Sequence, residues 1–375
     1  MTSVVPKVAV IGCGIAGAVC ASNLAKNGVS VTVFDLGRGP GGRMSQRRDI
    51  TNEGKELFFD HGAPYFTIEN TVVLDVIKEW KSRGLIAEWK EKFGAFDCIS
   101  KSFIDSGEEL SSRKYVGIPG MNSICKALCN EPGVEGKFGV GVAKMEWAVD
   151  QKTFSLISLD GKFLGNFDGL VATDKILASP GFTYITGQPP PLNMNLAPQL
   201  ALKIEQIPFR SYFVLMLAFS EPLHAISVKG FSFIHSEVLS SAFCDSSKPG
   251  RSSASECWVL HSTEEYAKKV IADAGRKKAS EATLAKVSEE LLLDFQRTGL
   301  CTSQPYFMKA HRWGSAFPSA SIAREDKCLW DTTKPLVACG DFCVSPNVEG
   351  AIQSGLAAAS KLMELCRNTS ETTSN

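Results

Sequence analysis

Residues 7–35 read KVAVIGCGIAGAVCASNLAKNGVSVTVFD, and this stretch decides the fold. The apolar run 8–11 is rich in β-branched residues and predicts a buried strand, while residues 18–26 have the spacing and composition of a helix. Gly28 suits the end of that helix, and the apolar run 29–34 predicts a second strand. A GxGxxG motif therefore lies between a strand and a helix, with an acidic residue ending the next strand. This arrangement is typical of a dinucleotide-binding βαβ unit.

Each residue of this motif has its own expected role. Gly12 permits a tight turn, Gly14 lets the backbone approach a pyrophosphate, and Gly17 lets the helix pack closely against the strand. The start of the helix offers free N–H groups and a partial positive charge to the phosphates. Asp35 would accept hydrogen bonds from an adenosine ribose. An isolated GxGxxG can be a simple glycine-rich turn, but the flanking strands, helix and acid favour dinucleotide binding.

Length and composition limit the possible classes of function. A chain of 375 residues suggests two domains, and its formal net charge of zero argues against nucleic acid or an anionic membrane as a partner. The apolar run 212–219 is too short to span a bilayer. The 12 cysteines include no CxxC and match no zinc or redox motif, so no metal site is expected. A reducing compartment is favoured, either the cytoplasm or an organelle stroma or matrix, for which a transit peptide could precede this sequence.

Two further stretches add to the cofactor site. Residues 37–44 read GRGPGGRM, and an arginine held by adjacent glycines at position 43 could bind the charge of a pyrophosphate. An ordinary basic loop is the alternative. Residues 58–66 read FFDHGAPYF, where small residues between aromatic ones indicate backbone packed against a flat ring. A plain core strand and turn would have the same composition.

These motifs resemble those of the renalase-like branch of the FAD-dependent amine oxidase superfamily. Later stretches match in the same order, namely VGIPGM at 116–121, HRW at 311–313, GD at 340–341 and VEGA at 348–351. The match covers the amino-terminal third and the carboxy-terminal quarter of the chain. The resemblance implies an α/β fold in which a Rossmann-type FAD-binding domain is joined to an α+β substrate domain, as in p-hydroxybenzoate-hydroxylase-like proteins.

The resemblance also implies where the cofactor lies. It places backbone at Val142 beside the adenine and Asp341 at the ribityl and phosphate region. The helix that begins near Gly350 would direct its N-terminus at the N1 edge of the flavin. The expected FAD-binding residues are Gly12, Gly14, Ile15, Ala16, Gly17, Asp35, Leu36, Gly42, Arg43, Met44, Gly62, Ala63, Val142, Gly340, Asp341, Glu349, Gly350 and Ala351.

The cofactor domain is expected to be discontinuous, because both ends of the sequence carry its motifs. A proline-rich stretch, 181–195, suggests a crossing between domains. The expected division assigns residues 1–67, 112–178 and 302–367 to the FAD-binding domain, 68–111 and 179–301 to the substrate domain, and 368–375 to a disordered tail.

Candidates for chemistry are fewer. The sequence has no HExxH motif, no visible histidine cluster and no nucleophile motif. His261, Trp313 and Tyr65 are the residues expected to face the substrate and assist catalysis, although plain core packing is an alternative for each. Lys309 could suggest the lysine of amine oxidases, but its setting does not match.

The resemblance implies oxidation of a reduced nicotinamide, with oxygen as electron acceptor. The dihydro isomers that ordinary dehydrogenases do not use are one option. The alternatives are an amine oxidase, a desaturase acting on a carotenoid or porphyrin precursor, and a flavin-binding protein without turnover. Because there is no second nucleotide fingerprint, a nicotinamide donor would bind mainly by stacking its ring on aromatic side chains.

Overall fold

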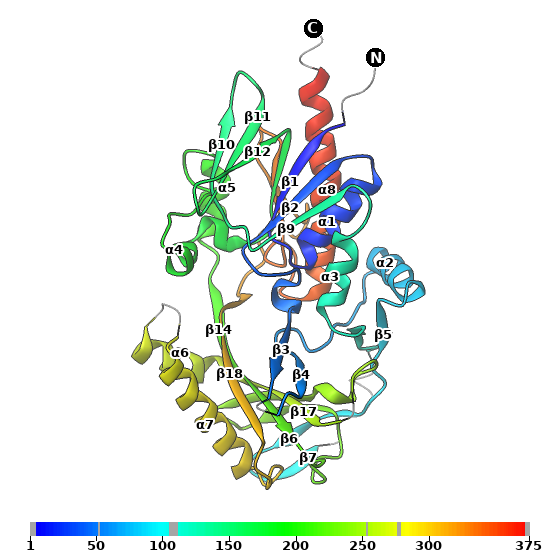
Figure 1. The fold of residues 1–375 in the computed structure, drawn as a ribbon, viewed down its shortest axis with the longest axis vertical. Coiled ribbons are helices and arrows are strands. Elements are labelled where there is room, and N and C mark those ends of the chain that lie inside the picture. Colours follow the sequence, from blue (N-terminus) through cyan, green and yellow to red (C-terminus); the bar gives the residue numbers. More distant parts are fainter. Residues whose placement is uncertain (1–4, 52, 105–111, 253, 276–278, 372–375) are drawn as a thin grey trace.

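The computed structural model describes residues 5–51, 53–104, 112–252, 254–275 and 279–371 of the chain. Two parts lie one above the other along the longest axis of the molecule (Figure 1). The upper part contains the sheet built on β1 and the end of the chain, and the lower part contains a large sheet flanked by two helices. The β3–β4 hairpin lies between the two parts.

The upper part is built on a six-stranded sheet in the order β19-β20-β13-β1-β2-β9. All of its pairs are parallel except β19–β20, which is antiparallel. The predicted βαβ unit is confirmed by β1, α1 and β2. Its strands are β1 (Lys7–Ile11), β2 (Ser30–Asp35), β9 (Val134–Phe138), β13 (Gly169–Ala172), β19 (Leu329–Trp330) and β20 (Leu336–Ala338).

Both faces of this sheet are buried, as in other parallel sheets. Val8 and Val10 pack on the side covered by α1 (Ile15–Lys26), α3 (Asn122–Cys129) and α8 (Val348–Glu371). A side-chain carbon at Gly355 would lie 2.4 Å from the Ala16 carbonyl oxygen, so a glycine in α8 lets it approach α1 closely.

The opposite face is covered by a second set of elements. Ala9, Ile11 and Phe34 pack there against a three-stranded sheet, one 3-10 helix and two short α-helices. These elements are β10 (Val142–Ala148), β11 (Thr153–Ser158), β12 (Phe163–Phe167), the 3-10 helix η3 (Lys175–Ala178), α4 (Pro180–Thr186) and α5 (Pro198–Glu205).

The lower part is a seven-stranded sheet in the order β18-β14-β17-β16-β15-β6-β7. One face packs against α6 (Glu264–Ala274) and α7 (Glu281–Arg297), and the other meets Leu57 and Phe59 of the hairpin. The strands are β6 (Phe93–Asp97), β7 (Ser102–Ile104), β14 (Phe209–Phe219), β15 (Gly230–Ile234), β16 (Leu239–Cys244), β17 (Glu256–Ser262) and β18 (Phe307–Pro318).

Smaller elements connect the two parts. They are η1 (Gly42–Met44), β3 (Gln46–Ile50), β4 (Glu56–Asp60), α2 (Thr71–Ser82), β5 (Ile86–Glu88), β8 (Tyr115–Gly117) and η4 (Asp245–Ser247). None of the helices in the described ranges combines the length and the apolar character needed to cross a membrane.

The structure divides the chain differently from the boundaries expected from the sequence. Helix α2 packs through Val73 and Ile77 into the core beside α1, and residues 192–207 pack into the opposite core of the upper sheet. Strand β18 pairs with β14 in the lower sheet. Short apolar segments do not reveal which of two cores they join, because that depends on non-local pairing. Helix α8 also continues to Glu371, into the expected tail, and residues 372–375 lie outside the described ranges.

Candidate functional site

The three glycines of the fingerprint have different structural roles. Gly12 has φ +105°, and a side-chain carbon there would lie 2.4 Å from Thr173 Oγ1. A side-chain carbon at Gly17 would lie 2.1 Å from the Gly12 carbonyl oxygen. Gly14 has φ −72°, and a side-chain carbon there would have none of the described residues within 4 Å. Gly12 and Gly17 therefore serve the fold, and Gly14 leaves open space at the start of α1, where Ile15 and Ala16 begin the helix. This space fits a phosphate group.

The GGRM loop lies directly against the fingerprint. The Gly41 N–H donates to the Cys13 carbonyl (2.8 Å), and a side-chain carbon at Gly42 would lie 3.1 Å from Gly14 Cα. Met44 is buried below the loop. Gly42, Arg43 and Met44 therefore lie beside the fingerprint, and their contact with a phosphate stays a prediction.

Asp35 lies at the end of β2 with its carboxylate bound to backbone. The N–H groups of Cys13 (2.5 Å) and Gly37 (2.6 Å) donate to its two oxygens. Burial raises the pKa of Asp35 above its usual value. The pocket beside it is mostly apolar and suits the adenosine end of a dinucleotide. Its lining includes Gly12, Phe34, Asp35, Leu36, Val140, Val142, Asp174, Leu177 and Phe182.

Sequence reasoning overlooked Asp174 in this pocket. Its position two residues after the buried strand β13 could have drawn attention to it, because side chains at the carboxyl ends of parallel strands gather at one edge. Val142 and Leu36, both predicted, line the same pocket, although Val142 begins β10 of the three-stranded sheet and Leu36 follows β2 of the six-stranded sheet.

Arg43 and Asp341 form an ion pair between the two ends of the chain. The guanidinium donates to both oxygens of Asp341 (2.6 and 2.8 Å) and also to the Ala316 carbonyl (2.8 Å). The Asp341 side chain is 5% exposed and the Arg43 side chain is 40% exposed. Gly340, the residue before Asp341, has a φ of +155°. Its N–H donates to the Ser354 hydroxyl oxygen in α8 (2.9 Å). The two predicted residues are thus in contact before any ligand is considered.

The turn after β4 packs on the GGRM loop. A side-chain carbon at Gly62 would lie 1.9 Å from the Arg43 carbonyl oxygen, and the Ala63 N–H donates to that oxygen (2.8 Å). The ring of Trp313 lies 3.3 Å from the same hypothetical carbon, and its Nε1–H donates to the His61 carbonyl (2.8 Å). Trp313 is therefore held in a fixed orientation beside Gly62. The surface formed by Trp313 and the turn at residues 61–63 is called the wall below, and its contact with a substrate stays a prediction.

Three of the five histidines of the chain gather at this wall. The rings of His61, His311 and Trp313 lie 4.9–5.1 Å apart. In the lower sheet Val214 pairs with His311 on one side and with His261 on the other, so both imidazoles share one face. The sequence interpretation, which found no histidine cluster, was wrong on this point, since residues far apart in the chain meet only through strand register.

These imidazoles remain uncharged near neutral pH. Burial, with His311 and Arg47 adding to it, lowers the pKa of His61 to about 3. Burial and Arg47 lower the pKa of His311 to about 4, and burial and Lys248 lower that of His261 to about 4. His61 Nδ1 and His261 Nε2 are shielded from solvent and have no hydrogen-bond partner among the described residues.

Acid should therefore destabilise the protein through these histidines. Their pKa values in the folded state, about 3 to 4, lie below that of an unfolded histidine, so the stabilisation is complete above pH 6.5 and declines as pH falls. Each contributes a slope of up to about 1.4 kcal/mol per pH unit. In denaturant unfolding at pH 7, 6 and 5, the free energy of unfolding should fall less steeply with pH for His311→Asn than for the wild type. His224→Asn, at an exposed position, is the control, and equal slopes for all three proteins would contradict the prediction.

Tyr65 belongs to an aromatic group next to the histidines. Its ring lies 5.8 Å from Phe243, whose ring in turn lies 5.7 Å from His261. The Lys114 ammonium lies 5.8 Å from the centre of the Tyr65 ring. Burial raises the pKa of the Tyr65 phenol, so it remains protonated. The three predicted catalytic residues, His261, Trp313 and Tyr65, thus lie around one region, and His61 and His311 are additions from the structure.

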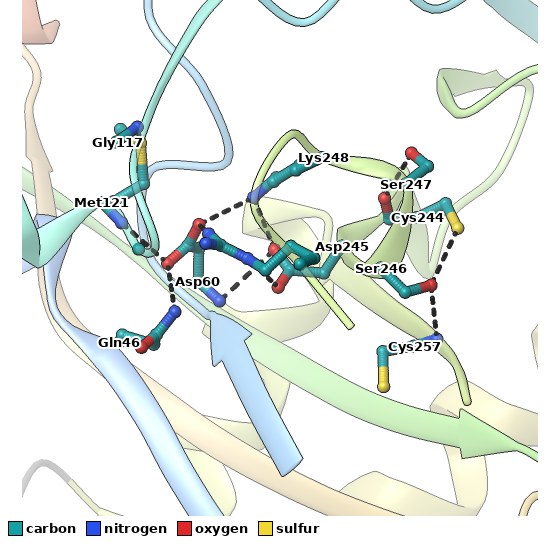
Figure 2. Close-up of polar contacts among 12 residues, drawn as sticks. Gln46, Asp60, Gly117, Met121, Cys244, Asp245, Ser246, Ser247, Lys248 and Cys257 are labelled. Carbon is teal, nitrogen blue, oxygen red and sulfur yellow. Dashed lines mark hydrogen bonds and ion pairs between the residues drawn. The ribbon is translucent and has the colours of Figure 1, made fainter. Parts of the chain in front are cut away.

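A buried charge network lies behind the turn that carries His61. The Lys248 ammonium donates to Asp60 (3.0 Å) and to Asp245 (2.5 Å), as Figure 2 shows. Arg251 contacts both carboxylates as well. The side chains of Asp60 and Lys248 are 0% exposed. The Met121 N–H, at the start of α3, donates to Asp60 (3.1 Å). This network fixes the turn because Asp60 directly precedes His61, and it joins both parts of the molecule.

Three predicted cofactor residues at the start of α8 are engaged within the protein. The Glu349 carboxylate accepts hydrogen bonds from the N–H groups of Glu69 (2.8 Å) and Asn70 (2.6 Å) before α2. The Gly350 N–H donates to Asn347 Oδ1 (2.7 Å), and Ala351 is buried. A side-chain carbon at Gly350 would lie 2.4 Å from the Ser345 carbonyl oxygen, so a larger residue would displace that turn whatever its effect on a cofactor.

Lys309 lies at the edge of the site rather than in its wall. Its ammonium donates to Asp49 of β3 (2.7 Å), and its side chain is 41% exposed. Arg47 also contacts Asp49 (3.3 Å). Among the described residues, no group of three or more histidines, cysteines or carboxylates could hold a metal ion.

Comparisons with known proteins agree with this arrangement. Residues 10–80 match a family model described as an NAD(P)-binding Rossmann-like domain, and residues 81–363 match one described as flavin-containing amine oxidoreductase. A protein provisionally assigned as a protoporphyrinogen oxidase from Exiguobacterium sp. 255-15 has a similar structure, with a TM-score of 0.67 and 12% identity over 97% of this chain and 100% of that one. A putrescine oxidase bound to putrescine gives a TM-score of 0.67 and 10% identity over 96% of this chain and 99% of that one. At these identities the likeness shows the fold.

Proposed function

The chain belongs to the flavin-containing amine oxidoreductase family, and from that premise we propose that it oxidises a reduced nicotinamide nucleotide and passes the electrons to oxygen. FAD is its cofactor, and FAD supplies the hydride acceptor and the means of returning electrons to an oxidant. The finer assignment follows the renalase-like motifs of the sequence, and isomeric dihydro forms of the nicotinamide are included. The chain itself must bind the donor, orient it and exclude water.

The charge of the wall is the observation that carries this proposal. Neutral imidazoles of His61, His261 and His311 line it, and the cations Arg47 and Lys248 act on them from two sides. The nearby carboxylates are already paired, Asp49 with Lys309 and Asp60 with Lys248. A protonated amine would find no unpaired counter-ion among these carboxylates, whereas a neutral dihydronicotinamide ring needs none.

The residues of the wall have distinct roles in this proposal. Trp313, fixed through its bond to His61, offers a flat face on which a nicotinamide ring can stack. The free nitrogens His61 Nδ1 and His261 Nε2 can bind a polar group such as a carboxamide, which would satisfy atoms that are otherwise buried without a partner. The Gly62–Ala63 turn contributes backbone without side-chain bulk.

Amine oxidation is the second candidate, favoured by the family and by the putrescine oxidase of similar fold. Anaerobic mixing with a panel of donors separates the two. We expect loss of flavin absorbance with reduced nicotinamide mononucleotide and dinucleotide, at similar rates, and none with putrescine or aromatic amines. Reduction by an amine but by no nicotinamide would reject the proposal in favour of amine oxidation.

Replacing Trp313 with alanine should weaken donor binding without affecting FAD. Loss of about 1–1.5 kcal/mol of stacking should raise the donor KM about 5- to 10-fold, with a smaller change in kcat. The ratio of absorbance at 450 and 280 nm, corrected at 280 nm for the lost tryptophan, reports FAD content and should equal that of the wild type. Trp147→Ala removes a tryptophan from β10, away from the wall, and should leave the donor KM unchanged. An unchanged KM in Trp313→Ala would exclude stacking on this ring.

A further inference from the structure

Lys175 is a buried lysine whose ammonium has no hydrogen-bonded or ion-paired anion among the described residues. It begins η3, directly after Asp174, and is 6% exposed. Its ammonium lies 3.9 Å from the centre of the Phe209 ring, where β14 begins. No hydrogen bond or ion pair joins this ammonium to another residue within the described ranges. Buried ammonium groups are normally paired, because removing them from water costs free energy.

Lys175 lies near two groups assigned above to the cofactor site. Its chain neighbour Asp174 lines the pocket that also contains Asp35. The paired Arg43 and Asp341 are both near enough to act electrostatically on the Lys175 ammonium. A dinucleotide that extends from the Asp35 pocket towards Asp341 must carry its phosphates through the intervening region.

We propose that Lys175 is a second cation, beside Arg43, for the phosphates of FAD. Arg43 is held by Asp341 in a bidentate pair, which neutralises much of its charge. Two phosphates carry two negative charges, so a second cation would be required to balance them. Lys175 has the charge, the burial and the unused hydrogen-bond donors for this purpose. Its contact with Phe209 orients the ammonium but leaves its N–H groups free.

The charge state of Lys175 provides a separate readout. Burial lowers the pKa of Lys175 to about 8, against the opposing effect of Asp174, while Arg43 adds to the decrease and Asp341 opposes it. The ammonium is therefore charged below pH 8 and loses its proton as pH rises through that value. Phosphate binding should weaken over the same range.

Titration calorimetry on FAD-depleted protein tests this with ADP, adenosine and FAD. Lys175→Met should lower the binding affinity for ADP and for FAD about tenfold, the effect expected for one charge-assisted hydrogen bond. The affinity for adenosine should not change. Lys175→Arg should bind ADP as the wild type does at pH 7. Between pH 7 and 9.5 wild-type affinity for ADP should fall, and that of Lys175→Arg should stay constant.

Two controls separate charge from packing. Phe209→Leu removes the aromatic contact but keeps the ammonium, and should bind ADP within about twofold of the wild type, because the charge that meets the phosphates is retained. Lys203→Met removes an exposed lysine of α5 and should have no effect. The proposal would be overturned if the Lys175→Met variant bound ADP as tightly as the wild type does. An equal loss of adenosine binding would also overturn it, because that would indicate a structural role.

Discussion

The Gly14→Val variant is expected to purify folded but colourless, without FAD. Gly14 has ordinary backbone angles, and none of the described residues would contact a side-chain carbon there, so valine causes no strain in the protein itself. The same side chain would project into the space at the start of α1 that suits a phosphate. The ratio of absorbance at 450 and 280 nm should fall to the baseline, while circular dichroism stays that of the wild type.

Gly12→Val is the matched control, with the opposite cause of failure. Its φ of +105° and its closeness to Thr173 make a side chain incompatible with the turn, so this variant should misfold or aggregate. The comparison distinguishes loss of a ligand from loss of the fold. A yellow Gly14→Val protein with a normal FAD content would contradict the location of the phosphates.

The second large effect is expected at Lys248. Lys248→Met removes one cation from a buried set of two carboxylates and two cations, and leaves Asp60 and Asp245 with Arg251 alone. An uncompensated buried charge costs about 3–5 kcal/mol. Denaturant unfolding with FAD at saturation should report a loss of this size. The FAD concentration must be equal for all variants because a bound ligand adds to apparent stability.

A double variant and a surface control make this prediction specific. Lys248→Met combined with Asp245→Asn restores charge balance, and should be at least about 1 kcal/mol more stable than the single variant. Lys78→Met breaks an exposed pair with Asp75, whose side chains are 77% and 78% exposed, and should change stability by less than about 1 kcal/mol. A loss no larger for Lys248→Met than for Lys78→Met would show that the network contributes little.

The cofactor-binding half of the fold was accessible from sequence because its signals are local. Strand, tight turn, helix and second strand follow one another within residues 7–35, and each is marked by its own composition. The roles expected of Gly12 and Gly17 agree with the contacts that a side chain would make there.

The wall of the site was not accessible in the same way. His61, His261 and His311 come from three separate segments, and only the register of β14 with β17 and β18 brings two of them to one face. A shift of one residue in either pairing would direct a histidine to the opposite face. Nor does sequence reveal that Glu349 binds the backbone before α2, because the two segments are 280 positions apart.

The sequence by itself determined the Rossmann unit, the glycine fingerprint and the type of cofactor, since these depend on the order of residues over short stretches of the chain. Only the tertiary structure decided which charges are paired and which are left over. Lys248 and Lys175 are both buried lysines, yet the Lys248 ammonium contacts two carboxylates, whereas the Lys175 ammonium lies over an aromatic ring and pairs with none of the carboxylates in the described ranges. The free energy of a buried charge depends on partners a few ångströms away in space, and spacing along the sequence does not encode those distances.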